Sequence, residues 1–216
     1  MTFTICTDEQ RSAGWFAARA GRVTGSKAKE ILANGKAGAE AVTRRDYRCQ
    51  LLAERLTGQP QESDFVNDAM RWGIEQEANA FAAYEAHSGH LVRRTGFLAC
   101  DDSMVGCSLD GDVDNFTGIV ELKAPKTATH LKYLKAGVVP SEHLAQIVHN
   151  LYVTDAQWCD FVSYDPRLPG PLQLFVIRHQ RDEKQIASYQ LALSLFLSEV
   201  EVEVFELRKR MELAVA

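Results

Sequence analysis

Two carboxylates and a lysine give this chain its clearest chemical signal. Asp110 stands beside Gly111, in a segment typical of a turn, and eleven residues later Glu121 and Lys123 alternate with apolar residues over 119–123. Two carboxylates can hold a hard divalent ion through oxygen ligands, and a neighbouring lysine can orient or activate a water for attack on phosphorus. The pattern therefore predicts metal-dependent phosphodiester cleavage. For this segment alone, a hairpin with one cross-strand Glu–Lys pair explains the residues equally well.

The alternation over 119–123 sets the charged residues within an otherwise apolar strand. A side-chain period of two places Glu121 and Lys123 on one face together with Ile119, and the two residues between them on the other. Burying a glutamate and a lysine on one strand face is costly unless a cation, a partner or a substrate compensates. The strand therefore favours a functional role for these two residues.

Composition predicts one globular domain over residues 1–216. The chain has 216 residues, 46% of them hydrophobic, which is enough for a sizeable core. No segment approaches the length of a membrane span, and the first residues lack the basic-then-apolar layout of a signal peptide. We therefore expect no membrane partner. The cysteines are odd in number, include no Cys-x-x-Cys pair and predict a reducing cytoplasm; they are Cys6, Cys49, Cys100, Cys107 and Cys159.

The net charge of −5 argues against a nucleic-acid partner, but the charge is unevenly distributed. Residues 11–59 hold ten Lys and Arg against four Asp and Glu, whereas residues 60–118 hold three against eleven. Such a division can place a basic rim beside an acidic metal pocket. Solvated helix faces of opposite sign would give the same counts without any function.

Hydrophobic periodicity predicts the elements that must position these residues. Helices are expected over 24–33, 38–56, 67–87, 127–136 and 141–153, and strands over 91–98, 104–108, 118–123, 157–164 and 172–179. These elements predict a mixed α/β domain, with a small central mixed sheet flanked by helices.

The last segment, near 183–213, predicts one long amphipathic helix. Its apolar residues recur at steps of three and four, although the strict alternation over 200–206 also fits a strand. The expected apolar positions are Ile186, Tyr189, Leu193, Phe196, Val200, Val204, Phe205, Leu207 and Met211.

Two further helices carry polar residues suited to phosphate chemistry. Glu77 borders the buried stripe of the helix over 67–87, where it could reach a water in the site or remain a solvated glutamate. Gln146 lies among apolar residues on the helix over 141–153 and could hydrogen-bond a phosphate or the lysine. On that helix His143 and His149 do not share a face, so they do not predict a zinc pair.

A third segment predicts a phosphate site. Arg19 and Arg22 lead to Thr24 and Ser26 ahead of an expected helix. Hydroxyl groups and free N–H groups at a helix N-terminus, beside guanidinium groups, bind phosphate readily. An ordinary N-cap with scattered surface arginines is the alternative.

Taken together and in order, these segments resemble the phage lambda exonuclease family, the viral recombinase or alkaline exonuclease branch of the PD-(D/E)XK nucleases. The resemblance spans roughly residues 15–164 and implies a restriction-endonuclease-like core. Several spaced motifs in one order are far more specific than any single one. The matching residues are Trp15, Arg19, Thr24 and Ser26; Met70-Arg71-Trp72-Gly73 with Glu77 and Tyr84; Ser108, Asp110 and Gly111; Glu121, Lys123 and Pro125; and Gln146 with Trp158-Cys159-Asp160-Phe161-Val162.

The resemblance implies roles for the residues of the predicted metal site. Asp110, Glu121 and the backbone carbonyl of Leu122 would hold magnesium. Glu77 would support a water in the site, and Lys123 would position the attacking water. The resemblance leaves open whether one or two magnesium ions bind and whether manganese can substitute.

The resemblance also implies a grip on the end of the DNA. Arg19, Ser26 and Ser108 match positions that hold a terminal 5′-phosphate, and Gln146 matches a glutamine beside the active lysine. One departure is Leu109, where the family often has a proline that would stiffen the turn.

The activity that follows from the resemblance is a magnesium-dependent 5′→3′ exonuclease. It would degrade one strand of double-stranded DNA from its end and leave a 3′ single-stranded tail for phage-type recombination by strand annealing. Members of the family form a ring-shaped homotrimer and work with a single-strand annealing protein. Two alternatives are a restriction- or repair-type endonuclease with the same core and a non-catalytic DNA-binding module.

Overall fold

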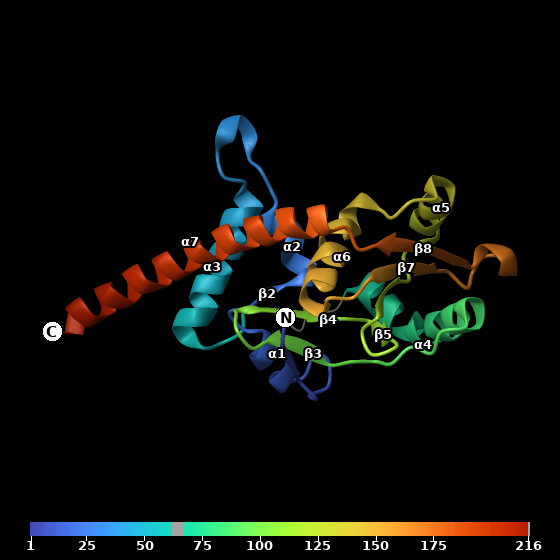
Figure 1. Ribbon diagram of the computed structural model, residues 1–216, viewed down its shortest axis with the longest axis horizontal. Helices are drawn as coiled ribbons and strands as arrows, with labels where there is room; N and C mark the ends of the chain where they lie inside the picture. Colours follow the sequence, from blue (N-terminus) through green and yellow to red (C-terminus); the bar gives the residue numbers. More distant parts are fainter. Residues whose placement is uncertain (62–66, 216) are drawn as a thin grey trace.

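The strands of the described part of the chain form two four-stranded mixed sheets flanked by helices (Figure 1). The computed structural model describes residues 1–61 and 67–215. The first sheet has the order β1 (Phe3–Ile5), β3 (Phe97–Cys100), β4 (Val105–Ser108) and β2 (Val23–Thr24). The second has the order β5 (Gly111–Val113), β6 (Gly118–Lys123), β7 (Trp158–Tyr164) and β8 (Leu174–Gln180). In each sheet one pair is parallel, β2 with β4 and β6 with β7.

The predicted α/β class is confirmed, but the strands divide into two sheets where the sequence predicted one. The chain passes from β4 in the first sheet to β5 in the second through Leu109 and Asp110. At this point the Leu122 N–H of β6 donates to Asp110 Oδ2 at 2.6 Å, so a side chain links the two strands there. The single domain expected over 1–216 includes residues 62–66 and 216, which lie outside the described residues.

Gly111 is required for close packing. The sequence suggested a turn glycine, but Gly111 begins β5 and is absent from the residues with positive φ. A Cβ at this position would lie 2.1 Å from Val92 Cγ1. Any side chain would therefore push β5 away from the segment that precedes β3.

Helices cover both faces of the second sheet. On one face, α4 (Asp68–Ser88) packs Phe81 and Tyr84 against Val120 and Leu122 of β6. On the other face lie α5 (Thr127–Ala136) and α6 (Ser141–Thr154), and Ile119 belongs to the core beneath them. The alternation predicted for β6 is therefore confirmed, with Glu121 and Lys123 on the α6 side.

The N-terminal region differs most from the expected elements. Two elements that the sequence did not predict are β1 and α1 (Ala13–Arg19), which begins at Ser12, whose Oγ accepts the Trp15 N–H at 3.2 Å. The helix expected over 24–33 is shorter, because Val23 and Thr24 pair with β4 as a strand. The chain then forms the 3₁₀ turn η1 (Gly25–Lys27) and α2 (Ala28–Ile31).

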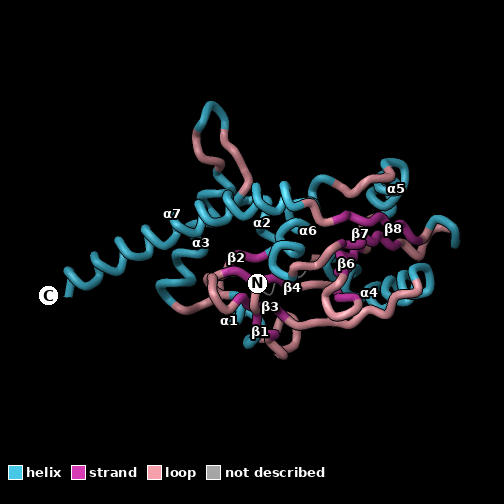
Figure 2. Tube along the Cα trace, viewed as in Figure 1, coloured by secondary structure: helices cyan, strands magenta, loops and turns pink. Residues whose placement is uncertain are grey.

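The remaining elements lie near their expected positions (Figure 2). After η2 (Lys36–Gly38), α3 (Val42–Thr57) ends at Gly58, whose φ is 68°. The strand expected over 91–98 is confined to β3, and residues 91–96 contribute only a bridge between Arg93 and Asp112. A 3₁₀ turn, η3 (Gly170–Leu172), precedes β8.

The long C-terminal segment is the helix α7 (Glu183–Val215), which excludes the strand alternative over 200–206. Six of the nine expected apolar positions are buried: Ile186, Tyr189, Leu193, Phe196, Val200 and Val204. The expectation was wrong for Phe205 and Met211, which are 70% and 59% exposed. Phe205 follows the buried Val204 and falls on another side of the helix. Met211 lies in the C-terminal part of α7, which extends away from the body (Figure 1). None of the described helices is long and apolar enough to cross a membrane.

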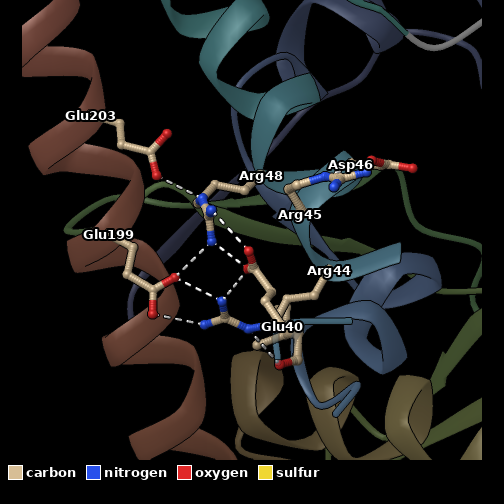
Figure 3. A network of polar contacts seen from close by, with 8 residues as sticks. Glu40, Arg44, Arg45, Asp46, Arg48, Glu199 and Glu203 are labelled. Carbon is tan, nitrogen blue, oxygen red and sulfur yellow. Dashed lines mark hydrogen bonds and ion pairs between the residues drawn. The ribbon is translucent and has the colours of Figure 1, made fainter. Parts of the chain in front are cut away.

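An ionic network holds α7 against α3 (Figure 3). The two terminal nitrogens of Arg44, Nη1 and Nη2, donate to Glu199 at 2.7 and 2.9 Å, and Arg48 Nε lies 2.7 Å from Glu203 Oε1. Glu40, which precedes α3, pairs with both arginines. Arg44 also donates to the Ile31 carbonyl at 3.3 Å. The network thereby joins α7 to both ends of the loop between α2 and α3.

Candidate active site

The centre of the site is the face of β6 that carries Glu121 and Lys123. Glu121 is 1% exposed, and its carboxylate forms an ion pair with the Lys123 ammonium group. Lys123 Nζ also lies 3.9 Å from Asp110 Oδ2. From α6, Asn150 Nδ2 donates to Glu121 Oε2 at 3.3 Å. The three residues of the strongest sequence motif are therefore together in space.

Burial and charge set the protonation of this centre. The pKa of Glu121 is raised to about 7 as the net result of three effects: burial raises it most, the Lys123 charge lowers it, and the Asp110 charge raises it. Burial lowers the pKa of Lys123, but the negative charges of Glu121 and Asp110 outweigh that effect and raise it above its ordinary value. The lysine is therefore cationic, and the two carboxylates favour further positive charge nearby.

Glu77 faces the same centre from α4. It lines two clefts with Asp110, the arginine cleft of about 480 Å³ and the central cleft of about 520 Å³. The arginine cleft includes Arg93 and Arg94, whereas the central cleft includes Leu122 and Lys123. Burial raises the pKa of Glu77, the Arg94 charge lowers it, and the Asp110 charge raises it.

The residues expected to bind phosphate lie on two sides of the centre. Arg19 is 8% exposed, its guanidinium group lies 4.2 Å from the Trp15 ring, and its Nη1 donates to Ser108 Oγ at 3.2 Å. Ser108 lines the arginine cleft. Ser26 is exposed instead in a third cleft, of about 260 Å³, which we call the Ser26 cleft. The parallel pairing of Thr24 with Gly106 brings these two serines to the same end of the first sheet.

The Ser26 cleft also holds the predicted glutamine. Gln146 and Lys123 both line it, so these residues flank one space as the sequence suggested. Gly25 lines it as well, and a Cβ there would lie 2.5 Å from Asn150 Oδ1. Glycine at this position therefore lets η1 approach the asparagine that holds Glu121.

Arg22 does not belong to the phosphate side of the site. Its Nη1 donates to the backbone carbonyls of Cys100, Ser103 and Val105 at 3.0, 2.9 and 3.3 Å. The guanidinium group thus stabilises the turn between β3 and β4. The interpretation of Arg22 as a phosphate ligand was wrong, because a sequence cannot distinguish an arginine that binds carbonyls from one that binds anions.

Sequence reasoning missed three residues of the site. Asn150 holds Glu121, Tyr133 lines the central cleft, and Arg94 pairs with Glu77 at 3.4 Å. His143 lines both the central and Ser26 clefts, and its Nε2 lies 3.4 Å from Tyr133 Oη. Burial, followed by the Lys123 charge, lowers the pKa of His143 to about 4, so its ring is neutral near pH 7.

His149, the other histidine of α6, is buried away from the clefts. Its ring nitrogens contact Tyr189 Oη at 2.6 Å and the Gly106 carbonyl at 2.9 Å. His143 thus faces the clefts and His149 faces the core, so the two histidines of α6 point to different sides of the helix, as expected.

The donor set around Asp110 suits a hard divalent ion. Asp110 and Glu121 provide carboxylate oxygens, and Leu122 lines the central cleft beside Asp110. Nowhere in residues 1–61 and 67–215 do three or more His, Cys, Asp or Glu side chains form a ready cage for a metal. Two carboxylates and a carbonyl that leave positions for water and phosphate are the arrangement that magnesium accepts. The residues present therefore fit this ion.

The fold and the site together define a nuclease of the PD-(D/E)XK fold. Its marks are mixed sheets with flanking helices, and Asp110, Glu121 and Lys123 gathered at the end of β6. The sequence pattern of the YqaJ-like viral recombinase domain matches residues 14–157. The chain therefore belongs to this family, the family of lambda exonuclease, as the motifs predicted. No curated protein matches the chain.

Solved structures support this assignment. The alkaline exonuclease LHK-Exo from Laribacter hongkongensis is 37% identical, with a TM-score of 0.82, and the match covers 95% of this chain and 100% of that chain. The same values hold for LHK-Exo in complex with dAMP. A phage related exonuclease from Haemophilus somnus 129PT is 16% identical with a TM-score of 0.66, covers 86% of this chain and 96% of that chain, and shows the fold alone.

Proposed function

We propose that this nuclease is a magnesium-dependent 5′→3′ exonuclease that degrades one strand of double-stranded DNA and leaves a 3′ single-stranded tail. The observation that carries the proposal is the convergence of Asp110, Glu121 and Lys123 beside the Arg19–Ser108 pair. The similarity to an exonuclease crystallised with dAMP supports it, because a deoxynucleoside monophosphate is what stepwise cleavage releases.

In this proposal Asp110, Glu121 and the Leu122 carbonyl hold the magnesium. When bound, the ion lowers the pKa of a water and offsets negative charge on the phosphate. Manganese offers the same oxygen affinity and is proposed as a substitute. Asn150 orients Glu121, so it acts as a positioning residue.

The remaining steps belong to side chains of the chain itself. Lys123 positions the attacking water, since its cationic ammonium group lies next to both carboxylates. Glu77 accepts a hydrogen bond from a water in the clefts that it shares with Asp110. Gln146 contacts the phosphate from the Ser26 cleft. General acid–base assistance of this kind contributes about 10²–10⁴ in rate.

The proposed grip on the DNA end consists of Arg19, Ser108 and Ser26. A terminal 5′-phosphate carries more negative charge than an internal diester and offers an additional oxygen to an arginine. Arg19 is held in place by Trp15 and by its hydrogen bond to Ser108, which makes it a fixed donor. Binding a terminal phosphate would restrict the nuclease to DNA ends.

We extend the proposal to assembly and context by family resemblance. Three copies would form a ring around the duplex, and a single-strand annealing protein would receive the 3′ tail in the cytoplasm of a bacterial or phage-infected cell. In the described residues the five cysteines are free and no helix is long and apolar enough to cross a membrane, which is compatible with this setting.

The phosphate grip is tested by comparing two duplexes that differ only at the end. Initial rates are measured on 5′-phosphorylated and 5′-hydroxyl duplexes with wild-type protein, Arg19→Ala and the control Arg45→Ala. Arg45 is a surface arginine of α3 with a 56% exposed side chain. The wild type and the control should favour the phosphorylated end, and Arg19→Ala should lose most of that preference. Equal wild-type rates, or cleavage of closed circular DNA, would favour an endonuclease instead.

A further inference from the structure

Arg94 is a cation at the active centre for which the sequence motifs give no role. It lies in the loop between α4 and β3 and lines the arginine cleft with Glu77, Ser108 and Asp110. Its Nη2 lies 3.4 Å from Glu77 Oε1, and its guanidinium carbon lies 4.9 Å from the centre of the Phe81 ring. The side chain remains 59% exposed.

The neighbouring Arg93 makes a structural contact in the same loop and serves as a comparison for Arg94. Arg93 binds both oxygens of buried Asp112, at 2.8 and 3.2 Å, and its backbone N–H donates to the Asp112 carbonyl at 2.9 Å. Arg94 has one longer contact to a carboxylate and the Phe81 ring 4.9 Å from its guanidinium carbon. A guanidinium group has five N–H donors, so a single 3.4 Å contact leaves most of them for a ligand in the cleft.

The charge of the arginine cleft explains why a cation is needed there. Four of its lining residues are acidic: Asp8, Glu9, Glu77 and Asp110. A DNA phosphate that approaches the centre from this side meets repulsion from all four. Arg93 is held by two hydrogen bonds to Asp112, whereas Arg94 has one contact of 3.4 Å to Glu77, so Arg94 is the more readily available of the two for a phosphate.

We propose that Arg94 binds a backbone phosphate of the cleaved strand beside the scissile bond, exchanging its ion pair with Glu77 for that phosphate. The Phe81 ring supports the guanidinium group, which can make a bidentate contact that a lysine could not reproduce. The exchange also releases Glu77 to accept a hydrogen bond from water. This inference rests on the proposed function, because it takes DNA as the ligand.

The first measurement is duplex binding in calcium, which occupies oxygen sites and allows affinity to be measured apart from turnover. Arg94→Ala should weaken binding roughly tenfold, the range expected for a lost contact to a charged group. The slope of log affinity against log salt should fall by about one. Arg94→Lys should lose part of the affinity and keep the slope, and the control Arg45→Ala should match the wild type.

A double-mutant cycle with Glu77→Gln separates binding from an effect through Glu77. If Arg94 contacts DNA, Arg94→Ala weakens binding in the Glu77→Gln protein by at least the same factor, because no ion pair has to be given up there. If Arg94 only neutralises Glu77, that factor falls to one in the same background, which would overturn the proposal. Wild-type affinity and an unchanged salt slope in Arg94→Ala would also overturn it.

End chemistry distinguishes this inference from the proposed function. Arg94→Ala should weaken binding equally for 5′-phosphorylated and 5′-hydroxyl duplexes, because the proposed contact is to an internal phosphate. A loss confined to the phosphorylated end would place Arg94 in the terminal grip and overturn the internal contact. Failure of the proposed function would show instead as a wild-type protein without end preference, whatever the Arg94 variants do.

Discussion

Replacing Lys123 separates its chemical role from its structural role. The ammonium group pairs with Glu121, which is 1% exposed, and lies 3.9 Å from Asp110 Oδ2. Lys123→Met keeps the length of the side chain and removes the charge, so no large cavity forms. Glu121 then retains Asn150 as a hydrogen-bond donor but no cation in contact with it among the described residues.

The expected loss of stability follows from the burial of this pair. Removing one partner of a buried ion pair costs about 3–5 kcal/mol. We expect about 3 kcal/mol, because Lys123 is 30% exposed and because Glu121, whose pKa burial already raises, can take up a proton. In a protein of this size, that loss lowers Tm by about 6–12 °C. Calcium supplies the missing positive charge and should restore most of the lost Tm.

Two assays test this prediction together. Thermal unfolding in EDTA and in calcium gives the stability, and initial rates in magnesium, divided by the folded fraction, give the chemistry. The rate per folded molecule should fall by about 10²–10⁴ because the attacking water loses its positioning. A rate per folded molecule near that of the wild type would exclude the chemical role of Lys123. A Tm loss that calcium leaves unchanged would exclude the missing positive charge as its cause.

Three further predictions follow from other parts of the structure. Asp110→Ala should abolish cleavage while DNA binding in calcium persists, and near-normal turnover by the folded variant would exclude Asp110 as a ligand. His149 has a pKa lowered to about 4 by burial, so its contribution to stability is full above pH 6.5 and is lost as pH falls toward 4. Between pH 6.5 and pH 4 the free energy of unfolding, measured in urea, should fall by roughly 3 kcal/mol less in His149→Gln than in the wild type, and equal falls would contradict this. Glu199→Gln should lower the free energy of unfolding by about 1 kcal/mol, a difference that shrinks in 1 M salt because Glu199 is 42% exposed; a salt-independent difference would point to packing instead.

The sequence was most informative where a signal is local. The alternation over 119–123 placed Glu121 and Lys123 on one face of β6, and helical spacing located α5 and α6. Short elements with few apolar residues, such as β1 and β5, carry no such signal. Phe205 was expected to be apolar core, but it is 70% exposed although the adjacent Val204 is buried, because a mixed helix and strand spacing does not fix which side of α7 faces the body.

The site could be predicted only in part for the same reason. Asp110, Glu121 and Lys123 are recognisable because they share one short segment and one chemistry. Asn150 and Arg94 reach the centre from α6 and from the loop before β3, so their roles depend on contacts between distant segments. A lone asparagine or arginine has many structural uses, and Arg22, which binds three carbonyls, shows how readily such a residue is misassigned.

The direction of digestion can be measured with end-labelled DNA. Linear duplexes labelled at either the 5′ or the 3′ end of one strand, and a closed circular duplex, are incubated with the protein in magnesium. A 5′→3′ exonuclease should release the 5′ label early as mononucleotide, keep the 3′ label on long single strands and leave the circle intact. Early release of the 3′ label, or linearisation of the circle, would contradict this activity.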